Sequence, residues 1–246
     1  MTPGEPSRRT AVVTGGGTGI GRAVAGLLAA DGYRVAVLGR RREVLDEVAR
    51  EIGGVAVTAD LALPSDVARA AADVADALGT IDALVLNAGS AHRGPQDTLE
   101  QVAAHWTETM TQNLLTAVLL EHALRPHLRR PGGRIVAVSS SSARVVGGQV
   151  AYAASKAAMN RWVVGLAAQL GAEGITVNAV APGFVPDTGL YDGTLDPAWT
   201  ERAARSIAVR RVGTPADIAD SVRWLVSSGA GFVNGTVVEV DGGRRV

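Results

Sequence analysis

The 246-residue sequence predicts an α/β fold, in which a doubly wound parallel sheet forms the middle of three layers and helices cover both of its faces. Short apolar runs of β type alternate along the chain with longer segments of helical periodicity, which implies crossover connections between parallel strands. Ligands bind outside the carboxyl ends of the strands in such sheets. At these ends the predicted strands are followed by small or polar residues, namely Gly15, Gly39, Asp60, Asn87 and Ser140.

Composition limits the classes of function that the chain can have. Apolar residues make up 47% and charged residues 20%, as in globular proteins with a large core. The 24 acidic and 24 basic residues cancel, so no basic surface indicates nucleic acid or an anionic membrane. Cysteine is absent, which excludes disulfides, thiolate catalysis and cysteine-based metal sites. His122 and His127 lie five apart and would not share a helix face, so we expect no metal.

The N-terminus and the domain organisation are simple. Residues 1–9 contain two prolines and a glycine but no apolar core segment, so they are predicted to form a flexible leader rather than a signal peptide. No apolar run approaches the roughly 20 residues of a membrane span. Without an internal repeat or linker, we expect a single domain over residues 1–246 and a cytoplasmic location.

The first predicted unit is a strand, a glycine turn and a helix. The strand covers Thr10 to Thr14, the turn reads Gly15-x-x-x-Gly19-x-Gly21, and an apolar stripe then continues to Asp31-Gly32. This setting favours a phosphate at the helix N-terminus, where bare N–H groups and the helix dipole attract an anion. A flexible turn without a ligand is the alternative, and the flanking elements favour dinucleotide binding.

The second predicted strand, Arg34 to Leu38, ends in Gly39 and three arginines, Arg40 to Arg42. In dinucleotide-binding folds, an acid at this strand end would grip the ribose of NAD, and an arginine would meet the 2′-phosphate of NADP. The alternative is a solvated charge run that opens the helix Glu43 to Ile52. Because arginines at a helix N-terminus oppose the dipole unless an anion is present, we favour NADP(H) over NAD(H).

The middle of the chain continues the alternation. A strand from Val55 to Ala59 ends in Asp60-Leu61, and Pro64 opens a helix that runs to Leu78. The next strand, Ala83 to Leu86, is closed by Asn87-Ala88-Gly89. A long helical region, Leu99 to Leu128, carries Asn113 near its middle, either as a tolerated polar residue or at a kink that frees a backbone group.

The stretch Ser139 to Lys156 carries the predicted chemistry. Of the 24 basic residues only Lys156 is a lysine, which leaves 24 − 1 = 23 arginines, and it follows Tyr152 by four positions. On a helix this spacing puts both side chains on one face. A free phenol has a pKa of about 10, and an adjacent ammonium would favour the phenolate and suit it to proton transfer. The alternative is a helix that carries the two residues by chance.

The C-terminal part completes the predicted sheet. The helix Ala151 to Gly171 is followed by a strand, Gly174 to Val180, and by Ala181-Pro182-Gly183. Residues 184–211 are irregular and rich in proline and glycine, as is typical of a substrate lid at the edge of a sheet. Thr214-Pro215 opens a helix that reaches Ser227, and Thr236 to Val240 forms the last strand.

These motifs together resemble the short-chain dehydrogenase/reductase family, and the resemblance spans about Ala11 to Gly243. It implies a Rossmann fold with a seven-stranded parallel sheet, and NAD(P) across the strand ends. It also implies the catalytic residues Asn113, Ser140, Tyr152 and Lys156. Tyr152 would be the acid or base, Lys156 would lower its pKa and hold the nicotinamide ribose, Ser140 would polarise the substrate oxygen, and Asn113 would anchor a water.

The same resemblance implies a set of cofactor-binding residues. The glycine turn would contact the pyrophosphate, and Asp60 and Leu61 would flank the adenine. Asn87 would lie along the cofactor, and Pro182-Gly183 with Thr188 would bind the nicotinamide amide. The complete set is Gly15, Thr18, Gly19, Ile20, Gly21, Arg40, Asp60, Leu61, Asn87, Ala88, Gly89, Tyr152, Lys156, Pro182, Gly183, Val185 and Thr188.

Two positions depart from the family pattern. The catalytic serine usually precedes the tyrosine by about thirteen residues, which gives Ser139, whereas counting along the strand from Arg134 gives Ser140. We choose Ser140, because alternation along a strand sets the facing of a side chain while a loop absorbs a deletion. The nicotinamide threonine often lies four residues after the glycine, where this chain has Asp187, and Thr188 follows.

The sequence therefore predicts an NADP(H)-dependent oxidoreductase that interconverts a ketone and a secondary alcohol. A 3-oxoacyl reductase acting on carrier-bound groups is an alternative, since Arg129 and Arg130 could meet an acidic carrier, although Glu173 occupies a position that is often basic in those enzymes. A non-catalytic regulator that senses NADP(H) is an alternative of another class. The family also suggests a homotetramer, with a small-molecule substrate and no nucleic acid or membrane partner.

Overall fold

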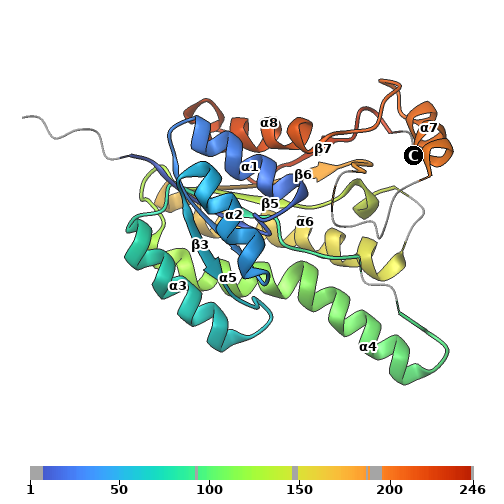
Figure 1. Ribbon diagram of the computed structural model, residues 1–246, viewed down its shortest axis with the longest axis horizontal. Coiled ribbons are helices and arrows are strands. Elements are labelled where there is room, and N and C mark those ends of the chain that lie inside the picture. The colour runs from blue at the N-terminus through green and yellow to red at the C-terminus, as the bar shows by residue number, and fades with distance from the viewer. Residues whose placement is uncertain (1–7, 92–93, 146–148, 187, 189–195, 245–246) are drawn as a thin grey trace, which may run out of the picture.

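A single seven-stranded sheet, with every strand parallel to its neighbours, forms the centre of the computed structural model (Figure 1). The structure describes residues 8–91, 94–145, 149–186, 188 and 196–244. The strand order is β3-β2-β1-β4-β5-β6-β7, so the direction of winding reverses between β1 and β4. The strands are β1 (Thr10–Thr14), β2 (Arg34–Gly39), β3 (Val55–Thr58), β4 (Ala83–Leu86), β5 (Arg134–Val138), β6 (Thr176–Pro182) and β7 (Val237–Val240). The predicted fold class is confirmed.

Helices cover both faces of the sheet, as Figure 1 shows. One face carries α1 (Gly19–Ala30), α2 (Arg42–Ile52) and α8 (Pro215–Val226), and the other carries α3 (Pro64–Leu78), α5 (Thr116–Leu124) and α6 (Val150–Leu170). Two further helices, α4 (Leu99–Met110) and α7 (Pro197–Ser206), lie beyond the carboxyl ends of the strands. Short 3-10 turns are η2 (Arg125–His127), η3 (Ser141–Ala143), η4 (Gly171–Glu173) and η5 (Ser228–Ala230).

The strands are buried on both sides, and their side chains alternate between two cores. In β1, Val12 packs into the core under α3, α5 and α6, whereas Ala11 and Val13 pack into the core under α1, α2 and α8. The same alternation in β5 sends Ala137 to the first core and Val138 to the second. Full burial of each valine or leucine contributes about 1.5–3 kcal/mol, so both faces of the sheet contribute to the stability of the fold.

Asn113 lies within η1 (Thr111–Leu115), a π-helical segment that connects α4 to α5. The predicted region Leu99 to Leu128 is therefore helical with a local widening at Asn113. Of the two readings of this residue, the π-helical widening favours a local departure from regular helix. A π-helical turn shifts the backbone pairing by one residue and commonly marks a functional position.

Two predicted segments are more ordered than we expected. The irregular stretch 184–211 contains α7, which begins where the Asp196 carboxylate accepts a hydrogen bond from Ala198 N and Pro197 occupies the first turn. In the leader, Arg9 O accepts a hydrogen bond from Arg34 N and the Arg8 guanidinium donates to Gly32 O, so both residues are tied to the fold. Residues 1–7 lie outside the described part.

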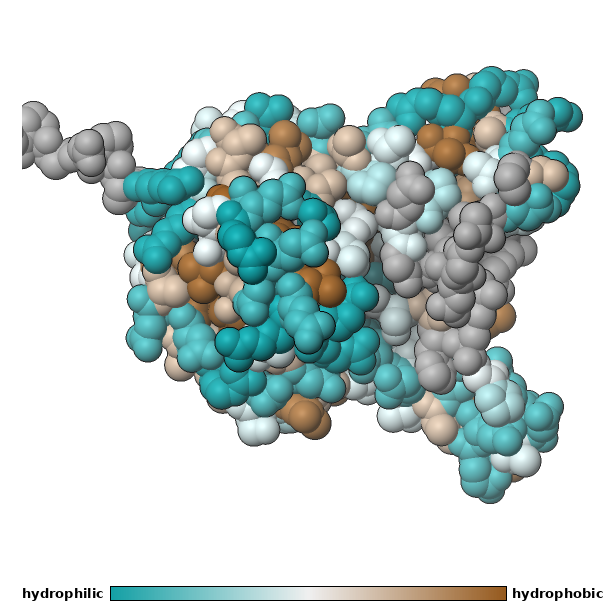
Figure 2. Space-filling view, viewed as in Figure 1, coloured by the Kyte–Doolittle hydropathy of each residue, from teal (hydrophilic) through white to brown (hydrophobic). Residues whose placement is uncertain are grey.

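The surface seen in Figure 2 is largely hydrophilic over α2 and α3. Each of these helices carries an ion pair between residues one turn apart, Arg42–Asp46 on α2 and Arg69–Asp73 on α3. Within the described ranges, no helix has the length and apolar character that crossing a membrane requires.

Candidate active site

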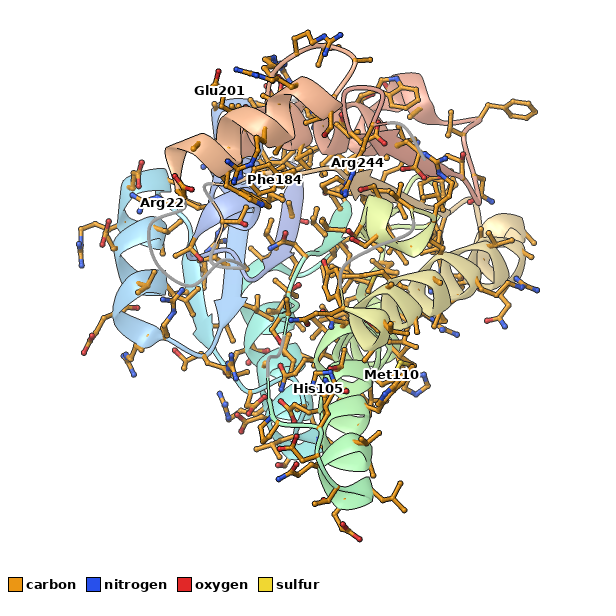
Figure 3. The ribbon with its side chains drawn as sticks, turned by 90° about the vertical axis from the view of Figure 1, so that its right-hand side faces the viewer. Arg22, His105, Met110, Phe184, Glu201 and Arg244 are labelled. Atoms are coloured by element: carbon orange, nitrogen blue, oxygen red, sulfur yellow. The ribbon has the colours of Figure 1, made fainter. Side chains whose placement is uncertain are left out.

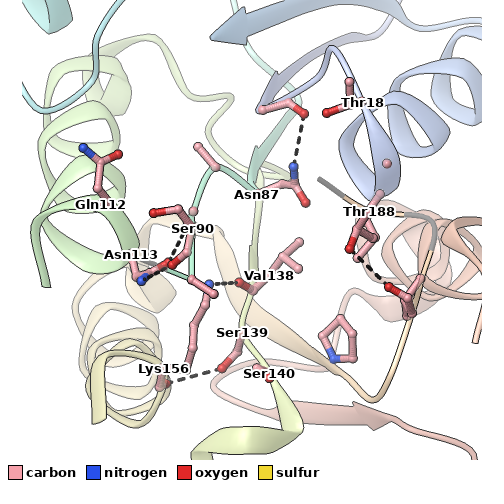
Figure 4. A pocket seen from close by; sticks show the side chains of 18 of the residues that line it. Thr18, Asn87, Ser90, Gln112, Asn113, Val138, Ser139, Ser140, Lys156 and Thr188 are labelled. Atoms are coloured by element: carbon pink, nitrogen blue, oxygen red, sulfur yellow. Dashed lines mark hydrogen bonds between the residues drawn. The ribbon is translucent and has the colours of Figure 1, made fainter. Parts of the chain in front are cut away.

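A cavity of about 900 Å³ opens at the carboxyl ends of the strands, where the winding reverses between β1 and β4. Its wall contains every predicted catalytic and cofactor-binding residue except Gly21. The predicted residues on the wall are Gly15, Thr18, Gly19, Ile20, Arg40, Asp60, Leu61, Asn87, Ala88, Gly89, Asn113, Ser140, Tyr152, Lys156, Pro182, Gly183, Val185 and Thr188. Figure 4 shows part of this wall from close by.

The glycine turn between β1 and α1 brings bare backbone to the cavity. Gly15 adopts a φ of +61°, which favours glycine, and a Cβ on it would lie 2.8 Å from Asn87 Nδ2. Gly21 serves packing instead, because a Cβ there would lie only 2.1 Å from Gly15 O. Thr18 makes no side-chain cap to α1, and the first turn of α1 has no acidic residue. The first N–H groups of α1 can therefore bind a phosphate.

Two arginines flank this turn from the end of β2. Arg40 and Arg41 both line the cavity, and the Arg41 guanidinium donates a 3.3 Å hydrogen bond to Thr18 Oγ1. Arg42 instead pairs with Asp46 along α2, at 3.5 Å. The sequence pointed to the arginine run and to Arg40, but only the structure singles out Arg41 as the residue that reaches the glycine turn.

Asn87 joins the end of β4 to the same turn. Its Nδ2 donates to Thr14 O at 2.9 Å, and its backbone N–H donates to Thr14 Oγ1. Figure 4 marks a further hydrogen bond, of 3.4 Å, from Asn87 Nδ2 to Gly15 O. Asp60 closes the adjacent edge of the cavity, where its Oδ1 accepts from Ala62 N. The Asn87 contacts join the ends of the neighbouring strands β1 and β4 at the cavity.

Lys156 is buried at the other end of the cavity, with an exposure of 3%. Its Nζ donates a 2.8 Å hydrogen bond to Val138 O and lies 5.8 Å from the centre of the Tyr152 ring. The predicted sharing of a helix face by these two residues is therefore observed. Burial lowers the pKa of the Lys156 ammonium from 10.5 to about 8. A lysine with such a pKa can exchange a proton near neutral pH.

The two candidate serines differ in what their hydroxyl groups contact. Ser139 continues the ladder, donates from Oγ to Lys156 O at 3.3 Å, and is 3% exposed. Ser140 is partly exposed on the cavity wall, and its Oγ accepts from Ser142 N at 3.1 Å. No acceptor among the described residues takes the Ser140 hydroxyl hydrogen. Ser140 can therefore donate to a ligand, whereas the Ser139 hydrogen is already used.

The side chain of Asn113 is fully buried and engaged within the protein. Its Nδ2 donates to Ser90 O at 2.9 Å and to Thr109 O at 3.1 Å, and its Oδ1 accepts from Ser90 N. A Cβ on Gly89 would lie 2.6 Å from Asn113 Oδ1 and 3.4 Å from Lys156 Nζ. The Asn113 amide thus fastens the loop after β4 to the π-helical segment. Ser90, which the sequence did not suggest, is its main partner.

The loop after β6 forms the wall opposite α6. Thr188 Oγ1 donates to Val185 O at 3.1 Å, and a Cβ on Gly183 would lie 2.8 Å from the Cα of Asp241. Asp187, the alternative to Thr188 in the sequence, lies outside the described residues. Phe184 and Trp199 also line the cavity, and their rings pack edge to face with 4.5 Å between the ring centres. No periodicity or motif in the sequence marks these two aromatic residues as cavity residues.

The residues present suit a nicotinamide dinucleotide. The cavity wall has a glycine turn and two arginines in one part, and a tyrosine, a serine and a buried lysine in another. Within the described ranges, no group of three or more His, Asp or Glu side chains is arranged to hold a metal ion. This fold and this set of side chains define a dinucleotide-dependent oxidoreductase.

Comparisons with known proteins agree with this class. A family model described as enoyl-(acyl carrier protein) reductase matches residues 15–245. Short-chain reductase protein NovJ of Streptomyces niveus is 39% identical over 95% of this chain and 93% of its own. The 3-oxoacyl-[acyl-carrier-protein] reductase MabA of Mycobacterium bovis is 34% identical over 96% of this chain and 92% of its own. A short-chain dehydrogenase from Burkholderia cenocepacia, solved in complex with NADP, is 38% identical, has a TM-score of 0.87, and aligns over 97% of this chain and 98% of its own.

The chain belongs to the short-chain dehydrogenase/reductase family, whose members are enzymes. Like them, it is an oxidoreductase that uses a nicotinamide cofactor.

Proposed function

We propose that this enzyme interconverts a ketone and a secondary alcohol with NADP(H), and that Tyr152 is its acid or base. The observation that carries the proposal is the position of the buried Lys156 ammonium, 5.8 Å from the Tyr152 ring, on the wall of the cavity that the glycine turn also lines. In the reducing direction, bound NADPH would supply a hydride to the carbonyl carbon. The carbonyl oxygen takes the phenol proton of Tyr152, which completes the alcohol.

The neighbouring residues support this chemistry with distinct roles. Ser140 would donate its free hydroxyl hydrogen to the substrate oxygen and hold it beside Tyr152. Lys156, with a pKa of about 8, would return a proton to the phenolate after turnover. Since the Asn113 amide is occupied by Ser90 and Thr109, the backbone of the widened helix turn, rather than the amide, would bind the water of a proton relay.

The assignment of Tyr152 and Ser140 is tested by substitution. Tyr152→Phe should leave the Kd for NADPH within a few-fold and lower kcat by orders of magnitude, because the phenol is removed and the ring is kept. Ser140→Ala should lower kcat about 100-fold, and Ser139→Ala less than tenfold. Retention of most of the native rate by Tyr152→Phe would contradict the mechanism, and a reversed order of the serine variants would move the role to Ser139.

The preference for NADP(H) over NAD(H) is supported by Arg40 and Arg41. Both line the cavity beside the glycine turn, and the Burkholderia cenocepacia relative was solved with NADP. Arg40→Ala and Arg41→Ala should each weaken NADPH binding about tenfold or more without changing NADH binding, because only NADPH carries the 2′-phosphate. Arg42→Ala is the matched control, since Arg42 pairs with Asp46. Tighter binding of NADH than NADPH by the native protein would overturn this preference.

A carrier-linked 3-oxoacyl reductase is the second candidate, and the sequence relationship to MabA favours it. The candidate docking arginines, however, are paired within the chain, Arg129 with Asp82 and Arg130 with Glu173. This pairing neutralises the charge that an acidic carrier would need. We therefore expect similar kcat/KM values for a 3-oxoacyl group on acyl carrier protein and on N-acetylcysteamine. A preference of more than tenfold for the carrier would favour the second candidate.

A regulator that senses NADP(H) without turnover would need none of the proton-transfer residues. A screen of ketones and alcohols, followed by the absorbance of reduced nicotinamide, separates the two possibilities. Turnover of any compound at a rate that Tyr152→Phe abolishes supports the enzyme. No turnover with any compound would favour the sensor.

We also propose that the domain is the whole of residues 1–246, that 184–211 acts as its substrate lid, and that the enzyme is a homotetramer in the cytoplasm. Exposed apolar side chains support two contact surfaces, with Trp106 of α4 and Leu115 of η1 on one, and Trp224 of α8 and the fully exposed Phe232 on the other. Sedimentation equilibrium tests the assembly, and a monomer at micromolar concentration would contradict it.

A further inference from the structure

Arg244 contributes a positive charge to the cavity wall from the end of the chain. It is partly buried and is bridged to Ile207, the residue after α7, while Trp199, Ala203 and Ser206 of α7 line the same cavity. Phe184 packs edge to face on Trp199 and extends this wall toward the loop after β6. Figure 3 labels Arg244 and Phe184 in the same half of the molecule, on the other side of the view from His105.

The fold determines the position of Arg244. An antiparallel bridge joins Ile207 to Arg244, and Val209 N donates a 3.1 Å hydrogen bond to Gly242 O. Gly242 and Gly243 have φ angles of +66° and +77°, which let the chain turn after β7 toward α7. Residues 242–244 are therefore paired with residues 207–209, which follow α7.

Arg244 has no acidic partner in the part of the chain that the structure describes. The two nearby carboxylates of β7 and its end, Glu239 and Asp241, lie 3.4 and 3.8 Å from the guanidinium of Arg144. Among the described residues that line the cavity, Asp60 is the one acidic residue, and it borders the predicted adenine site, where its Oδ1 accepts from Ala62 N. A partly buried guanidinium without a counter-charge, facing a cavity, is suited to bind an anion.

We propose that Arg244 binds a carboxylate of the substrate, and that the preferred substrates are keto acids or hydroxy acids rather than neutral ketones and alcohols. This inference rests on the proposed ketone and alcohol chemistry. The apolar rings of Phe184 and Trp199 would cover the part of the substrate between the carboxylate and the carbonyl. The cofactor phosphates are already provided for by the glycine turn, Arg40 and Arg41, so Arg244 serves the other ligand.

The test compares matched acids and esters. The probes are 5-oxohexanoate and 4-acetylbenzoate, each with its methyl ester, and kcat/KM is measured with NADPH for the native enzyme, Arg244→Gln and Arg244→Lys. Arg202→Gln is the control, because Arg202 is an exposed arginine of α7 that does not line the cavity. Binding of the same probes to the NADP⁺ complex is measured by calorimetry, which does not depend on turnover.

The native enzyme and Arg202→Gln should prefer each acid over its ester by about 10- to 100-fold, as expected for a charge-assisted hydrogen bond. Arg244→Gln should reduce the preference to less than threefold, Arg244→Lys should retain part of it, and both should bind NADPH as the native enzyme does. Reduction of esters and acids at equal rates would overturn the role of Arg244 and leave the proposed function intact. Acid binding that depends on Arg244 without turnover of any probe would uphold the anion site and count against the proposed function.

Three other results would overturn the inference. They are an acid preference that persists in Arg244→Gln, no binding of either acid to the native complex, and a loss of NADPH affinity in Arg244→Gln. The last result would show that Arg244 binds the cofactor and not the substrate.

Discussion

The buried ammonium of Lys156 should make the stability of the protein depend on pH by an amount that the structure sets. Burial lowers the pKa of this group from 10.5 to about 8. At about 1.4 kcal/mol per pKa unit, the charged form costs the folded state about 3 kcal/mol. Below pH 8 the folded and unfolded chains both hold the proton, so the folded state bears the full cost. Between pH 8 and 10.5 only the unfolded chain keeps the proton, and stability rises with pH.

The perturbation that isolates this effect is Lys156→Met. Both proteins carry Tyr152→Phe, which removes the phenol whose titration Lys156 would alter. The free energy of unfolding of the protein with Lys156 minus that of the variant should then rise by about 2.5 kcal/mol between pH 7 and pH 10, because the remaining titrating groups are common to both. Loss of the hydrogen bond to Val138 O shifts the variant by an amount that does not depend on pH. Urea unfolding without cofactor, at one protein concentration and at four pH values, measures this difference.

A second measurement follows from the sequence, since Lys156 is the only lysine. Labelling with ¹⁵N-lysine should give one side-chain ammonium signal, and its titration midpoint should lie near pH 8. A midpoint above pH 10, together with equal pH dependence of stability with and without Lys156, would refute the argument from burial.

Three further predictions concern packing. Gly21→Ala should abolish NADPH binding or prevent folding, because its Cβ would lie 2.1 Å from Gly15 O. Gly26→Ala, on the same helix, is the control, since its Cβ would meet nothing within 4 Å and the variant should be neutral or stabilised by about 0.5–1 kcal/mol. Calorimetric titration with NADPH and thermal melting compare the two variants. Gly89→Ala should lower kcat about tenfold or more by displacing the Asn113 amide, and a native rate in steady-state assays would contradict this. Thr214→Ala removes the capping box of α8, which should lower the free energy of unfolding by about 1 kcal/mol and Tm by about 2–4 °C. An unchanged melting curve would contradict this role of Thr214.

The elements and most of the predicted site could be recognised from local patterns. The helix of α3 begins at Pro64 and ends at Leu78 as expected, because proline at the first turn and an apolar stripe are properties of neighbouring residues. The Tyr152 and Lys156 pair was visible because helical spacing alone brings the two side chains together. The lid was predicted as irregular, and α7 was missed, since its short length and the proline and glycine around it weaken the helical signal.

By itself, the sequence determined the order of strands and helices, the glycine turn, the arginine run and the tyrosine-lysine pair, since each depends on spacing within one segment. Only the tertiary structure decided which of Arg40 to Arg42 face the cavity, which serine keeps a free hydroxyl hydrogen, and where Arg244 lies. These outcomes depend on contacts between residues far apart in the chain, such as Arg41 with Thr18, Ser139 with Lys156, and Ile207 with Arg244. No local pattern encodes such contacts, because they form only when the sheet brings the ends of its strands together.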